Sequence, residues 1–246
     1  MQQHQRSVTD KKQADEVLTL GNLTSPELIL DGSNDTFLVA VSYESQTLDA
    51  VYKPSKGERP LWDFQSGTLY KREYASYLIS QALCWDFIPC TVIREGPFGT
   101  GSVQEFIESN PQSNYFTLRY EYQEQLEAIA LFDCLANNAD RKATHCFADR
   151  AGKIWSIDHG LTFHQEPKLR TVIWDFSELQ ISTPLLHNLS NFLDNLLSAS
   201  MVLKHLTPLL TADELTALAL RAEQLLASRY FPAPDYNRRN IPWPWI

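Results

Sequence analysis

The fold of this chain is decided by Asn137-Asn138-Ala139-Asp140-Arg141-Lys142-Ala143-Thr144-His145 and, shortly after it, Ile154-Trp155-Ser156-Ile157-Asp158-His159-Gly160. Each stretch places an aspartate in a loop, and a short strand-turn-strand separates the two loops. Phosphoryl transfer needs such a pair, because one carboxylate orients or deprotonates the attacking hydroxyl while the other holds the divalent ion that neutralises the triphosphate. The two stretches therefore predict a phosphotransferase site built around Asp140 and Asp158.

A lysine and a glutamate upstream have the setting of a phosphate-binding pair. Lys53 ends the apolar strand 48–53, and Glu73 lies on the helix expected over 69–83. A lysine that must hold one pose in a cleft gains from a helix carboxylate that pins its side chain. The alternative is a lysine and a glutamate on exposed surface, and the two acidic stretches downstream favour the pairing.

Hydrophobic periodicity predicts a strand-rich first half and a helical second half, which is typical of an α+β chain. The strand-like runs are 27–30, 36–42, 48–53, 90–94, 102–107, 145–147 and 153–157. The helical runs are 69–83, 124–136, 185–203 and a stretch from the capping box at 211–214 toward residue 230. Between strands, the Gly- and Pro-containing segment 95–101 predicts a hairpin turn. Residues 1–16 are polar and predict a disordered leader, whereas the Pro- and Trp-rich ending 241–246 predicts an extended strap.

The bulk composition excludes several classes of protein. A formal net charge of -9 and a pI near 5.1 oppose a nucleic-acid partner and adhesion to anionic membrane. No stretch approaches the roughly 20 apolar residues of a membrane span. The four cysteines lack the paired spacing of a zinc ribbon and are expected to be free thiols. We therefore expect a cytoplasmic protein without nucleic-acid or integral membrane association.

The acidic stretches resemble the D-R-x-x-x-N and I-D-x-G signatures of phosphatidylinositol 3- and 4-kinases and HipA-like serine/threonine kinases. Further segments are similar to a bacterial family, known mainly from actinobacteria, that is grouped with those lipid kinases. The segments are Ala50-Val51-Tyr52-Lys53-Pro54, Gly57-Glu58-Arg59-Pro60-Leu61-Trp62-Asp63-Phe64, Gly96-Pro97-Phe98-Gly99 and Lys168-Leu169-Arg170-Thr171-Val172. The resemblance covers nearly the whole chain. It implies a two-lobed protein-kinase-like fold, with a sheet and one helix over residues 17–108 and a mainly helical lobe over 109–246.

The resemblance also implies ligands and a role for each candidate residue. ATP and a divalent metal, Mg²⁺ or Mn²⁺, would be the cofactors, and a protein or small-molecule hydroxyl would be the acceptor. Asp140 would be the catalytic-loop aspartate, Asp158 the metal aspartate and Lys53 the phosphate-binding lysine, with Glu73 as its helix partner. The hinge whose backbone reads adenine would consist of Gln104, Glu105, Phe106 and Ile107.

Two positions depart from the kinase pattern. His145 replaces the metal-ligating asparagine, and imidazole suits Mn²⁺ or Zn²⁺ better than Mg²⁺. The alternative is that His145 only hydrogen-bonds within the catalytic loop. The phosphate loop 31–35 has one glycine and two carboxylates, so that Ser33 and Asn34 would supply its donors while Asp31 and Asp35 would repel phosphate if they faced it.

These departures leave several functions open beside the phosphotransferase. One is a nucleotide-binding pseudokinase or a nucleotidyl transferase. Another is a metal-dependent hydrolase, which leaves Lys53 and Glu73 without a role. Its ligands would be Asp140, His145, Asp158, His159 and His164. Lys168 and Arg170 follow the metal loop, where they either meet the acceptor or lie in a solvated loop.

Overall fold

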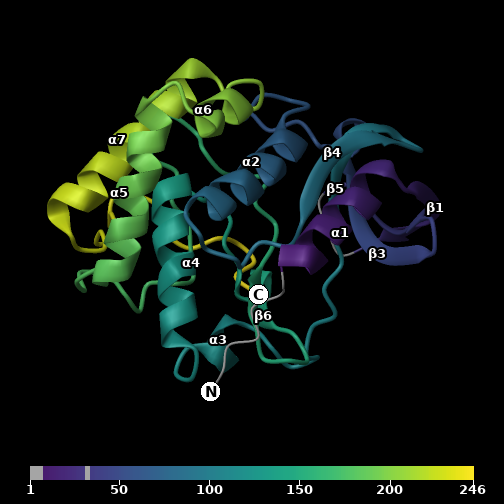
Figure 1. Cartoon of the computed structure of the whole chain (residues 1–246). Helices are drawn as coiled ribbons and strands as arrows, with labels where there is room; N and C mark the ends of the chain where they lie inside the picture. The colour runs from purple at the N-terminus through teal and green to yellow at the C-terminus, as the bar shows by residue number, and fades with distance from the viewer. Residues whose placement is uncertain (1–7, 31–33) are drawn as a thin grey trace.

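The computed structural model describes residues 8–30 and 34–246 (Figure 1). Its first half forms a five-stranded antiparallel sheet in the order β1-β2-β3-β5-β4. The strands are β1 (Asn22–Ile29), β2 (Thr36–Tyr43), β3 (Gln46–Pro54), β4 (Thr91–Gly96) and β5 (Gly99–Glu105). Gly96 pairs with Gly99 across a tight turn, which confirms the expected hairpin over 95–101.

Strand β5 approaches β3 closely at the end that carries Lys53. Gly101 pairs with Pro54, and a Cβ on Gly101 would lie 2.7 Å from the Pro54 Cα. Side chains essentially never approach backbone that closely, so only glycine fits here. The close approach fixes the backbone on which Lys53 projects from the sheet.

The expectation of a disordered leader over 1–16 is wrong for residues 8–16. Helix α1 (Val8–Leu20) packs on the sheet through Ala14, Val17 and Leu18, all buried. These three apolar residues follow helical spacing, which the polar residues around them obscured. Residues 1–7 lie outside the described part of the chain.

The second half is mainly helical, as expected. Its elements are α3 (Tyr115–Leu118), α4 (Gln123–Ala136), the strand pair β6 (Cys146–Ala148) and β7 (Ile154–Ser156), then α5 (Thr183–Leu197), α6 (Met201–Leu206) and α7 (Ala212–Ser228). The single helix expected over 185–203 is in fact two helices, because Ser200 caps the start of α6 by accepting a hydrogen bond from the Leu203 N–H. No helix of the described residues is long and apolar enough to cross a membrane.

Helix α2 (Leu69–Ala82) lies between the sheet and the helical half in Figure 1. Its buried residues Ala75 and Ile79 belong to the hydrophobic core of the helical half and not to the core of the sheet. The sheet has a separate core between its inner face and α1. Helix α2 is therefore an N-terminal element in sequence and a component of the C-terminal core in packing.

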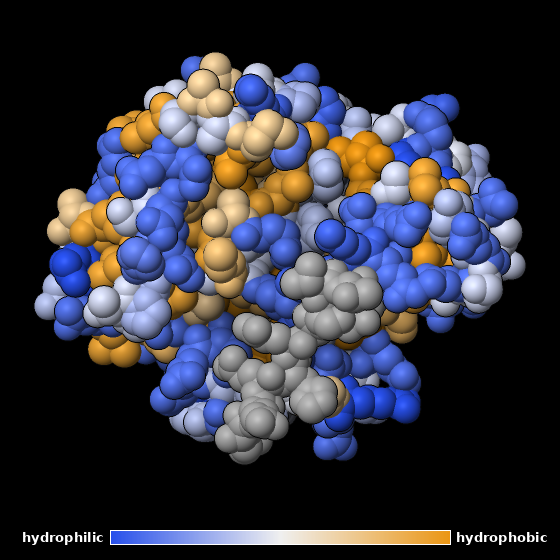
Figure 2. All heavy atoms as spheres, in the orientation of Figure 1, coloured by the Kyte–Doolittle hydropathy of each residue, from blue (hydrophilic) through white to orange (hydrophobic). Residues whose placement is uncertain are grey.

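The C-terminal residues form the expected extended segment on the body of the protein. The Asn240 carbonyl accepts hydrogen bonds from the Thr171 N–H and the Trp174 indole, and the Trp245 carbonyl accepts one from the Ala143 N–H. We call residues 232–246 the C-terminal strap. The face shown in Figure 2 is hydrophilic over most of its area, with hydrophobic residues visible between the helices of the C-terminal half.

Candidate active site

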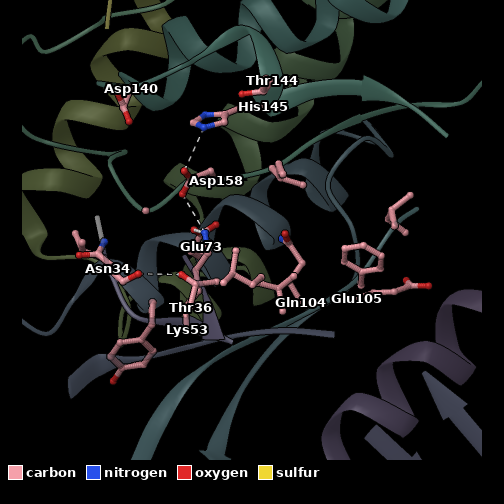
Figure 3. Close-up of a pocket in the computed structure, with 18 of the residues that line it drawn as sticks. Asn34, Thr36, Lys53, Glu73, Gln104, Glu105, Asp140, Thr144, His145 and Asp158 are labelled. Carbon is pink, nitrogen blue, oxygen red and sulfur yellow. Dashed lines mark hydrogen bonds and ion pairs between the residues drawn. The ribbon is translucent and has the colours of Figure 1, made fainter. Parts of the chain in front are cut away.

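Lys53, Glu73 and Asp158 meet at the junction of the sheet and the helical half. The Lys53 Nζ donates to the Glu73 Oε1 and lies 3.0 Å from the Asp158 Oδ1 (Figure 3). Burial acts to lower the pKa of Lys53, but the charges of Asp158 and Glu73 outweigh burial and raise the pKa above its ordinary value. The Lys53 charge in turn holds the pKa of Asp158 well below its usual range. The expected contact between Lys53 and Glu73 is present, and Asp158 completes a three-member ionic group.

Asp158 adopts a left-handed backbone conformation, with φ of 61°. Such a conformation costs about 1 kcal/mol or more for a residue other than glycine, and it persists only where neighbours hold it. Two contacts do so: the ion pair of the side chain with Lys53, and the hydrogen bond from the N–H of the next residue, His159, to the Glu73 Oε2 at 2.9 Å. The Asp158 side chain remains 46% exposed, so its oxygens are accessible from the cleft.

Asp140 lies on the same cavity, beyond the left-handed end of helix α4. Asn137 ends that helix with φ of 53°, and the Asn138 Oδ1 accepts a hydrogen bond from the Asp140 N–H at 3.0 Å. The Lys142 Nζ lies 3.2 Å from the Asp140 Oδ2. Burial raises the pKa of Asp140, and the charge of Lys142 opposes that rise. In Figure 3 the carboxylate stands apart from the Lys53 group, which leaves space between Asp140 and Asp158.

A buried ion pair holds the backbone of the catalytic loop in place. Arg141 and Asp133 are both fully buried, with the Arg141 Nη2 3.0 Å from the Asp133 Oδ1, and the Arg141 Nη1 donates to the Ile157 carbonyl at 2.8 Å. Sequence reasoning missed this pair. A carboxylate inside the apolar run of helix α4 was the available signal, because a buried charge requires a partner.

His145 faces Asp158, with its Nε2 3.3 Å from the Asp158 Oδ2. Burial lowers the pKa of His145 to about 4, although the charge of Asp158 opposes this effect. The ring is therefore neutral at pH 7. The Lys142 N–H donates to the His145 Nδ1 at 3.4 Å, so the proton of the neutral ring is placed on Nε2, the nitrogen that faces Asp158.

The donor set suits a divalent metal at Asp158 and suits it less well at His145. The exposed Asp158 carboxylate provides the oxygen ligands that Mg²⁺ and Mn²⁺ prefer. His145 would ligate through Nε2 only if its proton moved to Nδ1, against the Lys142 N–H that now points at that atom. Asp158 would hold the ion. The hydrogen bond to the His145 Nδ1 and the position of Nε2 beside Asp158 favour the alternative in which this ring orients Asp158.

A cavity of about 540 Å³ is lined by Glu73, Asp140 and Asp158 together with Lys53 and His145. Val51 and Ile29 line it from the sheet, and Phe147 and Ile157 line it from the helical half. Such paired apolar walls suit a flat heterocycle. The expected hinge residues also line this cavity: Gln104, Glu105, Phe106 and Ile107.

Three hinge groups are engaged inside the protein, the first of them the Glu105 N–H, which donates to the Cys90 carbonyl at 2.8 Å. The Gln104 side chain donates to the Thr91 hydroxyl at 2.9 Å, and the Phe106 N–H donates to the Asp49 carbonyl at 2.9 Å. We therefore expect adenine to be read by other backbone groups of this segment and not by the Gln104 amide.

The expected phosphate loop is described only in part, because Ser33 lies outside the described residues. Asn34 and Asp35 line the cavity. The Asn34 Oδ1 accepts a hydrogen bond from the Arg59 N–H, and the Asp35 N–H donates to the Gly57 carbonyl. Both residues thus connect this loop to the segment that follows β3.

Lys168 and Arg170 have different surroundings. The Lys168 Nζ lies 3.0 Å from the Asp63 Oδ2 and beneath the exposed Trp62 ring, so its charge is neutralised within the protein. Arg170 is half-buried, and its charge acts on Asp140. His159 and His164 do not join the cleft group: the His159 ring contacts Arg141 and Ser156, and the His164 ring packs on Phe64.

Comparison with known proteins identifies the relatives of this chain. Residues 90–211 match the family described as phosphatidylinositol 3- and 4-kinase. Protein Rv2133c of Mycobacterium tuberculosis (strain ATCC 25618 / H37Rv) is 35% identical over 263 aligned positions, which span 93% of this chain and 94% of the relative.

Two solved structures of the Golgi casein kinase share the fold. One has a TM-score of 0.61 at 14% identity, over 94% of this chain and 80% of that chain. The other, with Mn/ADP bound, has a TM-score of 0.58 at 14% identity, over 90% of this chain and 75% of that chain. The fold is thus that of a kinase. The chain belongs to the family of protein Rv2133c, within the phosphatidylinositol 3- and 4-kinase-like superfamily of atypical kinases.

Proposed function

We propose that this protein is an ATP-dependent phosphotransferase that acts on a hydroxyl group of a protein or small molecule. One observation carries the proposal: the Lys53 Nζ bridges Glu73 and Asp158 at a cavity that also contains Asp140. A lysine held by two carboxylates has a fixed pose for a phosphate group, and phosphoryl transfer depends on such positioning.

Each residue has a distinct task in this proposal. Lys53 binds the phosphates, and Asp158 holds a divalent ion, Mg²⁺ or Mn²⁺, that would neutralise the charge of the triphosphate. Asp140 orients the acceptor hydroxyl and takes its proton, a task that the raised pKa of its carboxyl favours. The apolar walls at Val51 and Phe147 enclose adenine.

The proposal is tested by ATP binding in calorimetry and by transfer of labelled phosphate. Transfer of label from the γ-position of ATP supports a kinase, whereas transfer from the α-position identifies a nucleotidyl transferase. Binding with neither transfer identifies a pseudokinase. Lys53→Ala and Asp158→Ala should weaken metal–ATP binding at least tenfold, about 1.4 kcal/mol, because each removes a charged contact to the ligand.

Asp140→Asn should behave differently from those two variants. It should keep ATP affinity and lose transfer about a hundredfold or more, since only proton acceptance by the carboxylate is removed. Wild-type ATP affinity in Lys53→Ala would show that the nucleotide site has been misplaced.

A hydrolase is disfavoured by the arrangement of the histidines. Among residues 8–30 and 34–246, no three His, Cys, Asp or Glu side chains form a group suited to hold a metal ion. His159 is buried behind Arg141. The hydrolase would also leave the Lys53 and Glu73 pair unused.

A further inference from the structure

Helix α2 carries two neighbouring charged residues that point to different lobes. Glu73 contacts Lys53 of the sheet, as described above. Arg72, the residue before it, contacts the helical half: its Nη1 donates to the Thr162 carbonyl at 2.7 Å, and its Nη2 forms an ion pair with Glu214 of helix α7. No local sequence pattern indicates this second contact, because Arg72 and Glu214 are 142 positions apart.

The contact between Arg72 and Glu214 is enclosed on all sides. Arg72 is only 4% exposed and Glu214 8%. The guanidinium also lies 5.1 Å from the centre of the Phe64 ring. The Glu214 carboxylate has a second task, because its Oε2 accepts the Thr211 N–H at 2.9 Å and so caps the start of α7. Arg72 therefore binds a rigid point of the helical lobe.

Arg72 also supports the turn that follows Asp158. It holds the Thr162 carbonyl, and the Thr162 hydroxyl donates to the His159 carbonyl at 2.8 Å. The His159 N–H is bound by Glu73. Arg72 and Glu73 thus hold the two ends of the turn 159–162. Asp158, with its left-handed backbone, directly precedes this turn.

We propose that Arg72 is a positioning residue that locks helix α2 to the helical lobe, so that Lys53, Glu73 and Asp158 are assembled before a nucleotide binds. This inference rests on the proposed function of the cleft. An outward swing of α2 would remove Glu73 from Lys53. Such a swing would also leave the buried charges of Arg72 and Glu214 without partners and withdraw Ala75 and Ile79 from the helical core, and both changes are strongly unfavourable. The site is consequently held in the assembled state without a regulatory partner.

The test uses a double variant, Arg72→Met with Glu214→Gln, in the full chain. Replacing both members avoids leaving an unpaired buried charge, and glutamine retains the cap on Thr211. The dissociation constant for Mg-ATP should rise about tenfold, with the protein still folded.

A double-mutant cycle separates positioning from general destabilisation. If Arg72 acts through Glu73, the double variant should cost little further Mg-ATP affinity in a Glu73→Gln background, about twofold or less. Arg119→Met is the control for loss of an Arg–carboxylate pair outside the cleft, because it removes the partly exposed pair with Asp175 in the helical half. It should leave Mg-ATP affinity unchanged.

Amide hydrogen exchange of helix α2 gives a readout that needs no nucleotide. In the ligand-free double variant the α2 amides should exchange faster than in wild type, and in Arg119→Met they should not. If the double variant fails to fold, Arg72→Lys is measured in the same way. Lysine keeps the charge but cannot make both contacts of the guanidinium group, one through Nη1 and one through Nη2. Unchanged exchange and unchanged affinity in a folded variant would overturn the role of Arg72. Failure of the wild type to bind Mg-ATP would instead overturn the proposed function, while the exchange experiment still decides whether α2 is locked.

Discussion

At the scale of single residues, the surroundings of His145 bear most directly on the two roles that the sequence left open for it, a metal ligand or a hydrogen-bonding group of the loop. If His145 were a metal ligand, nucleotide–metal affinity would be expected to fall as pH falls through about 6.5, the ordinary histidine range. The buried ring has a pKa of about 4 and directs its Nε2 toward Asp158. Any change in nucleotide–metal affinity caused by protonation of this ring is therefore expected near pH 4 and not near pH 6.5.

His145→Asn distinguishes a ligand from an orienting group. A ligand would make the variant shift its preference from Mn²⁺ toward Mg²⁺, since an amide oxygen is the harder donor. The hydrogen bond to the His145 Nδ1 and the position of Nε2 beside Asp158 predict instead that metal preference in nucleotide binding changes by less than about threefold. Calorimetric titration of ADP with each metal at pH 7 decides between them, and a large shift toward Mg²⁺ would contradict the orienting role.

The low pKa of His145 also predicts how stability depends on pH. The folded-state pKa of about 4 lies below the unfolded value of about 6.5, so folding favours the neutral ring. The contribution of His145 to the free energy of unfolding is fully present above pH 6.5. It is lost as pH falls from 6.5 to 4, by up to about 3 kcal/mol. Urea unfolding at pH 7.0 and 4.5 should show a smaller decrease for His145→Asn than for wild type. An equal decrease in both proteins would show that other groups account for the acid sensitivity.

At the scale of secondary-structure elements, the end of helix α4 decides where the catalytic loop begins. Asn137 is buried and left-handed, and its side chain makes three hydrogen bonds to the segment after Asp158. The Asn137 Nδ2 donates to the carbonyls of His164 and Glu166, and its Oδ1 accepts the Lys168 N–H. One residue thus ends a helix and joins the loop that contains Asp140 to the segment that follows Asp158.

Asn137→Ala should lower the free energy of unfolding by about 2–4 kcal/mol, because it strains the backbone and leaves buried polar groups without partners. Asn137→Gly is the matched variant, since glycine accepts the left-handed conformation but lacks the amide. It should lose less stability than alanine, by about 1 kcal/mol. Denaturant titration measures both, and equal losses would mean that the backbone conformation contributes nothing.

At the scale of the whole molecule, the C-terminal strap supports a loop about a hundred positions earlier in the sequence. The Ala143 N–H, in the buried part of the catalytic loop, donates to the Trp245 carbonyl at 2.9 Å. The Trp245 ring packs edge-on against Phe116, with ring centres 5.3 Å apart. The last residues are thus part of the support of Asp140 and His145.

Removal of Trp245 and Ile246 should loosen the catalytic loop while the fold persists, because a buried N–H without a partner costs about 1–3 kcal/mol. Hydrogen exchange of the Ala143 amide should accelerate at least tenfold, and transfer activity should decrease while Mg-ATP affinity is retained. Trp243→Ala removes a ring that is 74% exposed and keeps the backbone contact, so it should match wild type. Protection of Ala143 that survives the truncation would show that the strap is dispensable.

The sequence by itself determined the local features of the site and the order of the elements. Lys53 at the end of an apolar strand, Glu73 at helical spacing and the aspartates of two flanking loops are short-range patterns, and the strands and helices around them follow from periodicity. Periodicity therefore predicted the α+β class, and the resemblance to known kinases implied the two-lobed kinase fold. Two predictions of secondary structure were wrong because their signals are short. The helix over 8–20 has few apolar residues among polar ones, and the break between α5 and α6 depends on a single serine cap.

Only the tertiary structure decided which of these groups meet. Lys53 and Asp158 are 105 positions apart, and Arg72 and Glu214 are 142 apart, so no local pattern links either pair. The state of His145 likewise depends on burial, since desolvation lowers its pKa and selects the neutral ring. Residue types and spacing define what chemistry a chain can perform, whereas distance, burial and dielectric environment arise only when remote segments pack together.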